Sequence, residues 1–147
     1  MLYFAYGSNL NHHQMKFRCE GAKYLNNFSL PGYKLCFSHK TDNSVFGHAN
    51  IIKSKKSKIK GAIWKITKEH EKELDVYEGV DYGYYQKEYF IYKGKKVLVY
   101  IQKIYYFQKP SSKYLHTIIQ GYKDCLLDTK YLKKVVMNYK INYKINW

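Results

Sequence analysis

Two short stretches of this 147-residue sequence carry residues suited to chemistry. The first runs from Leu2 to Leu10 and reads LYFAYGSNL. Its apolar and aromatic first half is typical of a buried strand, Gly7 allows a sharp left-handed turn, and Ser8 and Asn9 often cap helices. Such a turn from strand to helix leaves backbone N–H groups that point one way and suit an anion or a carbonyl oxygen. An ordinary strand-to-helix connection has the same pattern and is the alternative interpretation.

The second stretch, LDVYEGV from Leu74 to Val80, ends a predicted helix that begins at Thr67. Glu78 lies in the last turn, where the helix carries partial negative charge and an acid is disfavoured by about 0.3–1 kcal/mol. The chain has 26 basic and 11 acidic residues, yet it places two acids in this turn. An unfavourable local choice often marks a functional site, and the helix end is expected to raise the carboxyl pKa toward the range of a general base. The alternative is a solvated carboxylate neutralised by lysines; for Asp75 we expect a structural role.

The elements that must position these stretches are strands with helices between them. We expect strands over residues 2–6, 23–30, 33–38, 47–52, 59–66, 84–92 and 97–107, with turns at 31–32, 53–58 and 93–95. We expect helices over residues 11–17, 67–79, 110–126 and 128–137. This order indicates an α+β domain whose strands curl into a barrel.

Residues 138–147 alternate strictly between apolar or aromatic side chains and Asn or Lys. A period of two predicts a half-buried strand, and a frayed terminus is the alternative. We therefore divide the chain into a domain at residues 1–137 and a C-terminal extension at residues 138–147, expected to be an edge strand. Because an exposed edge can pair with another copy, one expectation is a homodimer formed through this strand.

Composition narrows the classes of partner and the cell compartment. The net charge of +15 raises nucleic acid or an acidic protein as a partner, but the lysines are spread along the chain and Arg18 is the only arginine, which argues against nucleic acid. No run of about 18 apolar residues and no secretory signal occurs, so we expect no membrane span. Cys19, Cys36 and Cys125 form no CxxC pair, so we expect neither disulfides nor a metal site, and a cytoplasmic location.

Four separated stretches together resemble the gamma-glutamylcyclotransferase-like family, also called AIG2-like. They are YFAYGSNL at residues 3–10 with Gln14-Met15 and Arg18-Cys19, LPGY at 30–33, LDxxEGV at 74–80 running into GYY at 83–85, and Pro110-Ser111 with Tyr114-Leu115. Any one stretch is a weak match, but the set follows the family's order over about residues 2–135. The resemblance implies an α+β fold built as a small mixed β-barrel with flanking helices.

The resemblance also implies an activity. It implies a cyclotransferase that cleaves a small gamma-glutamyl compound to 5-oxoproline and a free amine or amino acid, with no metal or cofactor. It implies that Glu78 is the catalytic acid/base. The implied substrate-binding residues are the first loop, whose backbone amides hold the glutamyl group, and three pocket aromatics: Gly7, Ser8, Asn9, Leu10, Tyr6, Tyr85 and Tyr114.

Elementary chemistry agrees with that activity. The substrate's own α-amine attacks its γ-carbonyl, so no protein nucleophile is needed, and the sequence has no Ser-His-Asp or Cys-His signature. One carboxylate can take the ammonium proton and then protonate the leaving amine, while oriented donors bind the developing charge. Two alternatives stay open: a cyclotransferase that acts on a gamma-glutamyl group carried by a larger biosynthetic intermediate, and a non-catalytic basic binding module on the same fold.

Overall fold

The structure is a computed structural model that describes residues 1–147. Its elements are β1 (Leu2–Ala5), the 3-10 helix η1 (Ser8–Leu10), α1 (His12–Arg18), β2 (Lys23–His39), β3 (His48–Lys65), α2 (Lys68–Tyr77), the 3-10 helix η2 (Val80–Tyr82), β4 (Gln86–Tyr92), β5 (Lys95–Ile101), β6 (Tyr106–Phe107), α3 (Ser112–Asp124) and α4 (Thr129–Met137). The four expected helices are all present, within a few residues of their predicted bounds.

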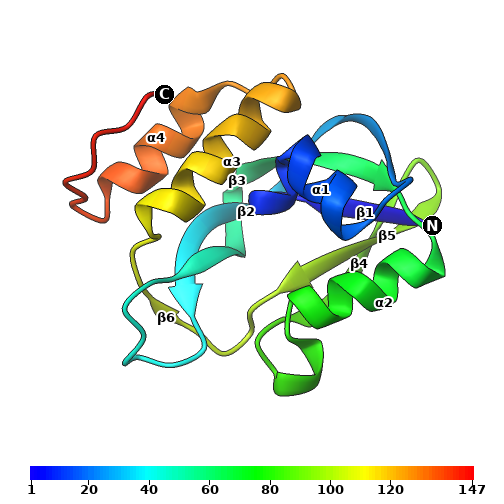
Figure 1. The fold of residues 1–147 in the computed structure, drawn as a ribbon, viewed down its shortest axis with the longest axis horizontal. Coiled ribbons are helices and arrows are strands. Elements are labelled where there is room, and N and C mark those ends of the chain that lie inside the picture. The colour runs from blue at the N-terminus through cyan, green and yellow to red at the C-terminus, as the bar shows by residue number, and fades with distance from the viewer.

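The six strands form one curled sheet in the order β4-β5-β1-β3-β2-β6. The first strand, β1, lies inside the sheet, parallel to β5 on one side and antiparallel to β3 on the other. Figure 1 shows α3 and α4 side by side at one end of this sheet and α2 at the other. The expected α+β fold with a mixed, curled sheet and flanking helices is confirmed, in the form of a half-barrel with β4 and β6 at its two edges.

Two long strands replace the four short ones that we expected. Residues Pro31-Gly32 lie inside β2 and residues 53–58 lie within β3, so neither is the predicted connecting turn. The two strands pair from Lys23 with Lys65 to Ser38 with His48, and the pairing skips Gly32 on one strand and residues 54–57 on the other. The β2–β3 pairing continues on both sides of these residues. The local turn signals therefore produce an irregularity inside one long hairpin and not a separate turn.

The helix α2, which carries Glu78 at its end, is held at both termini. At its start the Thr67 hydroxyl accepts from the His70 backbone N–H, and His70 Nδ1 accepts from the Thr67 N–H, both at 3.1 Å. This is a full capping box in which His takes the place of the usual Glu or Gln. At its end Gly79 adopts a left-handed conformation with φ 61°, so the helix stops immediately after Glu78.

The C-terminal extension, residues 138–147, forms no strand, so the edge-strand prediction is wrong. The predicted alternation is nevertheless present: its odd-numbered side chains are half-buried against the core and its even-numbered ones are exposed. The Tyr139 hydroxyl accepts from the Phe37 N–H at 2.7 Å, and the Tyr143 hydroxyl donates to the Pro110 carbonyl at 3.1 Å. The extension thus reaches β2 through side chains, not through backbone pairing. The domain boundary at residue 137 and a homodimer through this segment stay predictions.

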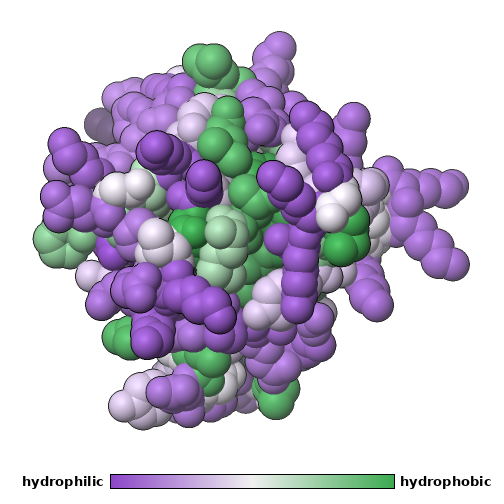
Figure 2. Space-filling model, turned by 90° about the vertical axis from the view of Figure 1, so that its right-hand side faces the viewer, coloured by the Kyte–Doolittle hydropathy of each residue, from purple (hydrophilic) through white to green (hydrophobic).

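Figure 2 shows one face of the molecule, on which hydrophilic side chains dominate the periphery and hydrophobic ones gather mainly near the centre. None of the helices has the length and apolar character needed to cross a membrane.

Candidate active site

The loop after β1 is a tight turn with unused backbone donors. It forms η1, in which Leu10 N–H donates to Gly7 at 3.1 Å and Asn11 N–H to Ser8 at 3.0 Å, whereas the N–H groups of Gly7, Ser8 and Asn9 have no such partner. Leu10 therefore departs from the prediction: its amide is used inside the turn and its side chain is fully buried in the core. Asn11, not Ser8 or Asn9, caps α1.

The glycine of this loop is required for close packing. Gly7 has φ −120°, so the left-handed turn that we expected is not formed. A Cβ atom at this position would lie 2.8 Å from the Ala49 Cβ of β3 and 3.5 Å from the Tyr114 hydroxyl of α3. Only a residue without a side chain allows the loop to lie this close to β3.

The helix α3 holds the loop from the other side. A Cβ atom on Gly121 would lie 2.6 Å from the Leu10 Cβ, so α3 packs directly on η1. The Asn11 side chain donates to the Thr117 carbonyl of α3 at 3.2 Å. The loop is therefore fixed between a strand and a helix, which suits donors that must not move when charge develops beside them.

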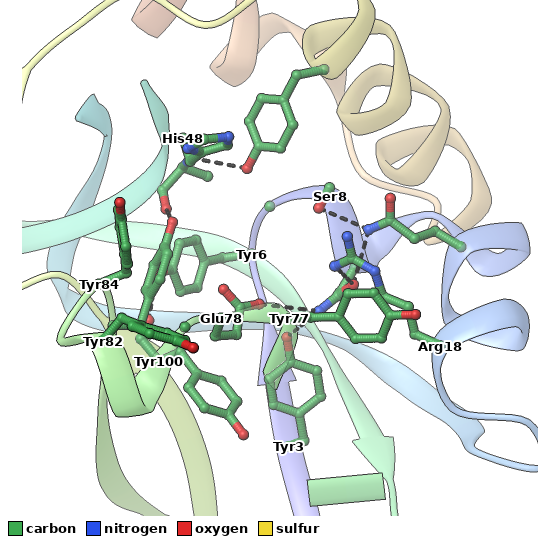
Figure 3. A pocket seen from close by; sticks show the side chains of 17 residues that line it. Tyr3, Tyr6, Ser8, Arg18, His48, Tyr77, Glu78, Tyr82, Tyr84 and Tyr100 are labelled. Carbon is green, nitrogen blue, oxygen red and sulfur yellow. Dashed lines mark hydrogen bonds between the residues drawn. The ribbon is translucent and has the colours of Figure 1, made fainter. Parts of the chain in front are cut away.

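Glu78 follows α2 and its side chain points toward this loop (Figure 3). Its N–H donates to the Leu74 carbonyl at 2.8 Å, which fixes the backbone, and its carboxylate forms no salt bridge. Burial raises the pKa of Glu78 to about 7, and the Arg18 guanidinium opposes this shift. The main cause is burial and not the helix end that we expected, and the alternative of a carboxylate neutralised by lysines is wrong.

A cavity of about 420 Å³ joins the loop and Glu78. All the sequence-predicted site residues except Leu10 line it: Tyr6, Gly7, Ser8, Asn9, Glu78, Tyr85 and Tyr114. Sequence reasoning assigned no role to the other lining residues, which are Tyr3, Gln14, Arg18, His48, Ala49, Tyr77, Gly79, Tyr82, Tyr84 and Tyr100. Three exposed tyrosines among these, Tyr77, Tyr82 and Tyr84, surround the carboxyl in Figure 3.

The predicted pocket tyrosines are rigid parts of the wall. Tyr6 donates to the Tyr100 carbonyl at 2.5 Å, and Tyr85 donates to the Ala49 carbonyl at 2.6 Å. The Tyr114 hydroxyl accepts from the Ala49 N–H at 3.0 Å. Burial raises the pKa of all three, that of Tyr114 to about 12, so each hydroxyl stays neutral. Burial also lowers the pKa of His48, the histidine that lines the cavity. Glu78 is therefore the lining group whose pKa lies near 7.

A hydrogen-bond network that sequence reasoning missed connects the loop to Glu78. The Asn9 side chain donates to the Tyr3 hydroxyl at 2.9 Å and, through a long bond of 3.4 Å, to Glu78 Oε1. Its carbonyl oxygen accepts from Gln14 at 3.0 Å and from Arg18 at 3.1 Å. One signal was available: Gln14 and Arg18 are four residues apart on α1 and so share a face, and Arg18 is the only arginine.

No group of three or more His, Cys, Asp or Glu side chains is arranged to hold a metal ion. What the cavity offers is one half-buried carboxyl with a raised pKa and, opposite it, a rigid set of donors. Such a pair defines a site for proton transfer at a substrate that carries negative or developing charge.

Comparisons with known proteins identify the class. The family model described as gamma-glutamyl cyclotransferase, AIG2-like, matches residues 3–123. Human and bovine proteins named gamma-glutamylcyclotransferase are each 32% identical over 143 residues, covering 91% of this chain and 76% of theirs. A solved structure titled gamma-glutamyl cyclotransferase matches with a TM-score of 0.80 at 29% identity, covering 99% of this chain and 92% of that chain.

The fold is therefore that of a gamma-glutamylcyclotransferase-like enzyme. The chain belongs to the gamma-glutamyl cyclotransferase, AIG2-like family. The relatives in this family are named as enzymes, which favours a catalyst over the non-catalytic binding module.

Proposed function

We propose that this protein is a gamma-glutamyl cyclotransferase that converts a gamma-glutamyl compound to 5-oxoproline and a free amine or amino acid. One observation carries the proposal: the Glu78 carboxyl, with its pKa raised to about 7, lies in the same cavity as the N–H groups of Gly7, Ser8 and Asn9. The proposal needs both parts, because the reaction moves a proton and builds negative charge on an oxygen.

In the first step Glu78 acts as a base. Its carboxylate accepts a proton from the substrate α-ammonium, and the amine lone pair then attacks the γ-carbonyl carbon. A carbon–nitrogen bond forms, the ring closes, and the carbonyl electrons move onto the oxygen. The loop amides are oriented to bind the substrate's negative charge, either its carboxylate or this oxygen.

In the second step Glu78 acts as an acid. The protonated carboxyl donates its proton to the leaving nitrogen, the original amide bond breaks, and the electrons on the oxygen re-form the carbonyl. The ring nitrogen still carries a second proton, which the restored carboxylate removes and passes to the released amine. The products are 5-oxoproline and the protonated free amine, and the carboxylate is again ionised. A pKa near 7 suits both steps, because at neutral pH neither the acid nor the base form is scarce.

The remaining contribution is positioning. The fixed tyrosine walls and the loop held by β3 and α3 confine the substrate so that its amine lies against its own carbonyl. Because the amine and the carbonyl belong to one molecule, the gain comes from holding the substrate in its ring-closing conformation and not from bringing two reactants together.

The direct test incubates the protein with a panel of gamma-glutamyl amino acids and bulkier gamma-glutamyl amines, and measures 5-oxoproline by mass spectrometry. We expect 5-oxoproline and one equivalent of the matching amine from at least one compound, above a no-enzyme blank. Turnover of only the bulky amines would indicate a larger biosynthetic substrate. No 5-oxoproline from any compound would contradict the proposal.

A further inference from the structure

The side-chain amide of Asn9 forms all the hydrogen bonds that it can form, so it has one preferred orientation of its nitrogen and oxygen. A side-chain amide offers two N–H donors and two acceptor positions on its oxygen. The nitrogen of Asn9 donates to the Tyr3 hydroxyl and to Glu78, and the oxygen accepts from Gln14 and Arg18. If the amide turned over, its oxygen would face the Glu78 carboxylate, and two acceptors would meet.

Of the groups around this amide, only one is a donor under all conditions. Gln14 is itself an amide and can present either its nitrogen or its oxygen, and the Tyr3 hydroxyl can donate or accept. Arg18 has five N–H donors, no acceptor, and a charge that it does not lose. The atom of Asn9 that faces Arg18 must therefore be the oxygen, and the nitrogen must face Glu78.

The guanidinium is itself held in place. Its central carbon lies 4.3 Å from the centroid of the Tyr77 ring, one residue before Glu78, and this stacking is favourable for a planar cation. Arg18 is also the last residue of α1, whose first turn is fixed by the Asn11 cap. Figure 3 shows Arg18 beside Tyr77 and on the same side of the cavity as Ser8.

We propose, on the basis of the function proposed above, that Arg18 is a positioning residue: its guanidinium fixes which end of the Asn9 amide faces Glu78. Through Asn9 it determines that the carboxyl receives a hydrogen bond, which favours the ionised form that acts as the base. Its own positive charge, close to the cavity, acts in the same direction.

The other groups that face Glu78 do not replace this effect. Besides Arg18 on α1, the groups that interact electrostatically with its carboxyl are neutral tyrosines. They are Tyr3 on β1, Tyr6 after β1, Tyr85 before β4, Tyr100 on β5 and Tyr114 on α3. None of these supplies a positive charge, and burial lowers the pKa of His48 of β3, which also lines the cavity, so that its neutral form is favoured. Arg18 is therefore the charged group that opposes the burial of Glu78.

The test compares Arg18→Met, which keeps an apolar stem but removes the charge and the donors, with Arg18→Lys, which keeps both. The pKa of the Glu78 carboxyl is measured without substrate, by carbon-13 NMR of glutamate-labelled protein, with Glu78→Gln to assign the signal. We expect Arg18→Met to raise this pKa by about one unit or more, as for the loss of a nearby opposite charge, and Arg18→Lys to restore most of the difference.

The matched control is Lys16→Met, which removes the same charge from the same helix at an exposed position that does not line the cavity. It should leave the Glu78 pKa unchanged. If Arg18→Met does not fold, Arg18→Gln serves in its place, and the same rise is expected. An unchanged pKa in the folded neutral variant, or an equal shift with Lys16→Met, would overturn the proposal.

The kinetic consequence is a shift of the pH profile. In Arg18→Met the acid limb of kcat/KM should move to higher pH, so that activity falls about tenfold at pH 6 and recovers above pH 8. A merely structural defect would lower activity at every pH. If the wild-type protein forms no 5-oxoproline, the proposed function fails, whereas the NMR titration still decides whether Arg18 sets the state of Glu78.

Discussion

Two acids three residues apart, at the end of the same helix, have opposite environments. Asp75 lies outside the cavity, where its carboxylate accepts from Lys87 at 2.8 Å and from the Tyr100 hydroxyl at 2.7 Å. Glu78 faces the cavity, forms no salt bridge, and receives one long hydrogen bond. The carboxylate of Asp75 has the hydrogen-bond partners of a structural residue, whereas that of Glu78 is left free to interact with a substrate.

An acid at a helix C-terminus can therefore be interpreted only when its interaction partners are known. Both acids are unfavourable in the last turn by the same electrostatic argument, so that argument alone does not separate them. The partners separate them: Lys87 forms a salt bridge with Asp75, whereas the charge that acts on Glu78 is that of Arg18, which forms no salt bridge with it. The expected structural role of Asp75 fits these contacts.

The largest effect is expected from Glu78→Gln. This change keeps the size of the side chain but removes the acid and the base, so 5-oxoproline formation should fall by at least about 10²–10⁴-fold, the usual contribution of general acid–base catalysis. Rates are measured with the best substrate of the panel, and circular dichroism checks the fold. Wild-type-like turnover by the folded variant would remove Glu78 from the mechanism.

Gly7→Ala should have the next largest effect. The added methyl group would lie 2.8 Å from the Ala49 Cβ, so the loop must move and its amides lose their alignment. We expect kcat/KM to fall by up to about 100-fold. The double variant Gly7→Ala with Ala49→Gly removes the clash and should recover much of the loss; no recovery would mean that close packing is not the reason for the glycine.

A third prediction concerns stability against pH. Because the pKa of Glu78 is raised from 4.5 to about 7 on folding, the folded protein keeps a proton that the unfolded chain releases. This contribution is complete below pH 4.5 and is lost as pH rises through 7, by about 3 kcal/mol. In urea unfolding, Glu78→Gln and wild type should match at pH 4.5, and the variant should be the more stable at pH 8. Equal stability at both pH values would mean that the carboxyl is solvated.

The smallest effect is expected from Asp75→Asn. It weakens the contacts with Lys87 and Tyr100 on a side chain that is 25% exposed, so the loss of stability should be about 1 kcal/mol. The melting temperature should fall by about 2–4 °C, and the pH profile of kcat/KM should not move. A shift of that profile as large as the one expected for Arg18→Met would erase the distinction between the two acids.

Local signals in the sequence predicted the helices well, because their caps are local. Ser111 accepts from the Tyr114 N–H and Asp128 from the Lys130 N–H, as their positions before α3 and α4 indicated. The long strands were not predicted, because pairing along the whole hairpin overrides the turn preference of Pro31-Gly32. The extension shows the same limit: a period of two predicted which side chains are buried, but not that they would contact the protein without forming a strand.

The site divides in the same way. Glu78 and the Gly7–Asn9 loop were visible from residue types and from the family resemblance, and they lie in one cavity. The contributions of Gln14 and Arg18 could not be predicted from the sequence, because they depend on the orientation of the Asn9 amide, which no spacing rule encodes. The cause of the raised Glu78 pKa was also hidden, since burial is a property of the assembled fold.

The pH dependence of kcat/KM for 5-oxoproline formation by the wild-type enzyme tests whether Glu78 is the base. This quantity reports the ionisation of the free enzyme, so its acid limb should have an apparent pKa of about 7, the value for Glu78 in the cavity. An acid limb near 4.5, the ordinary value for a glutamate, would contradict the account, because the base would then be a carboxylate in contact with water.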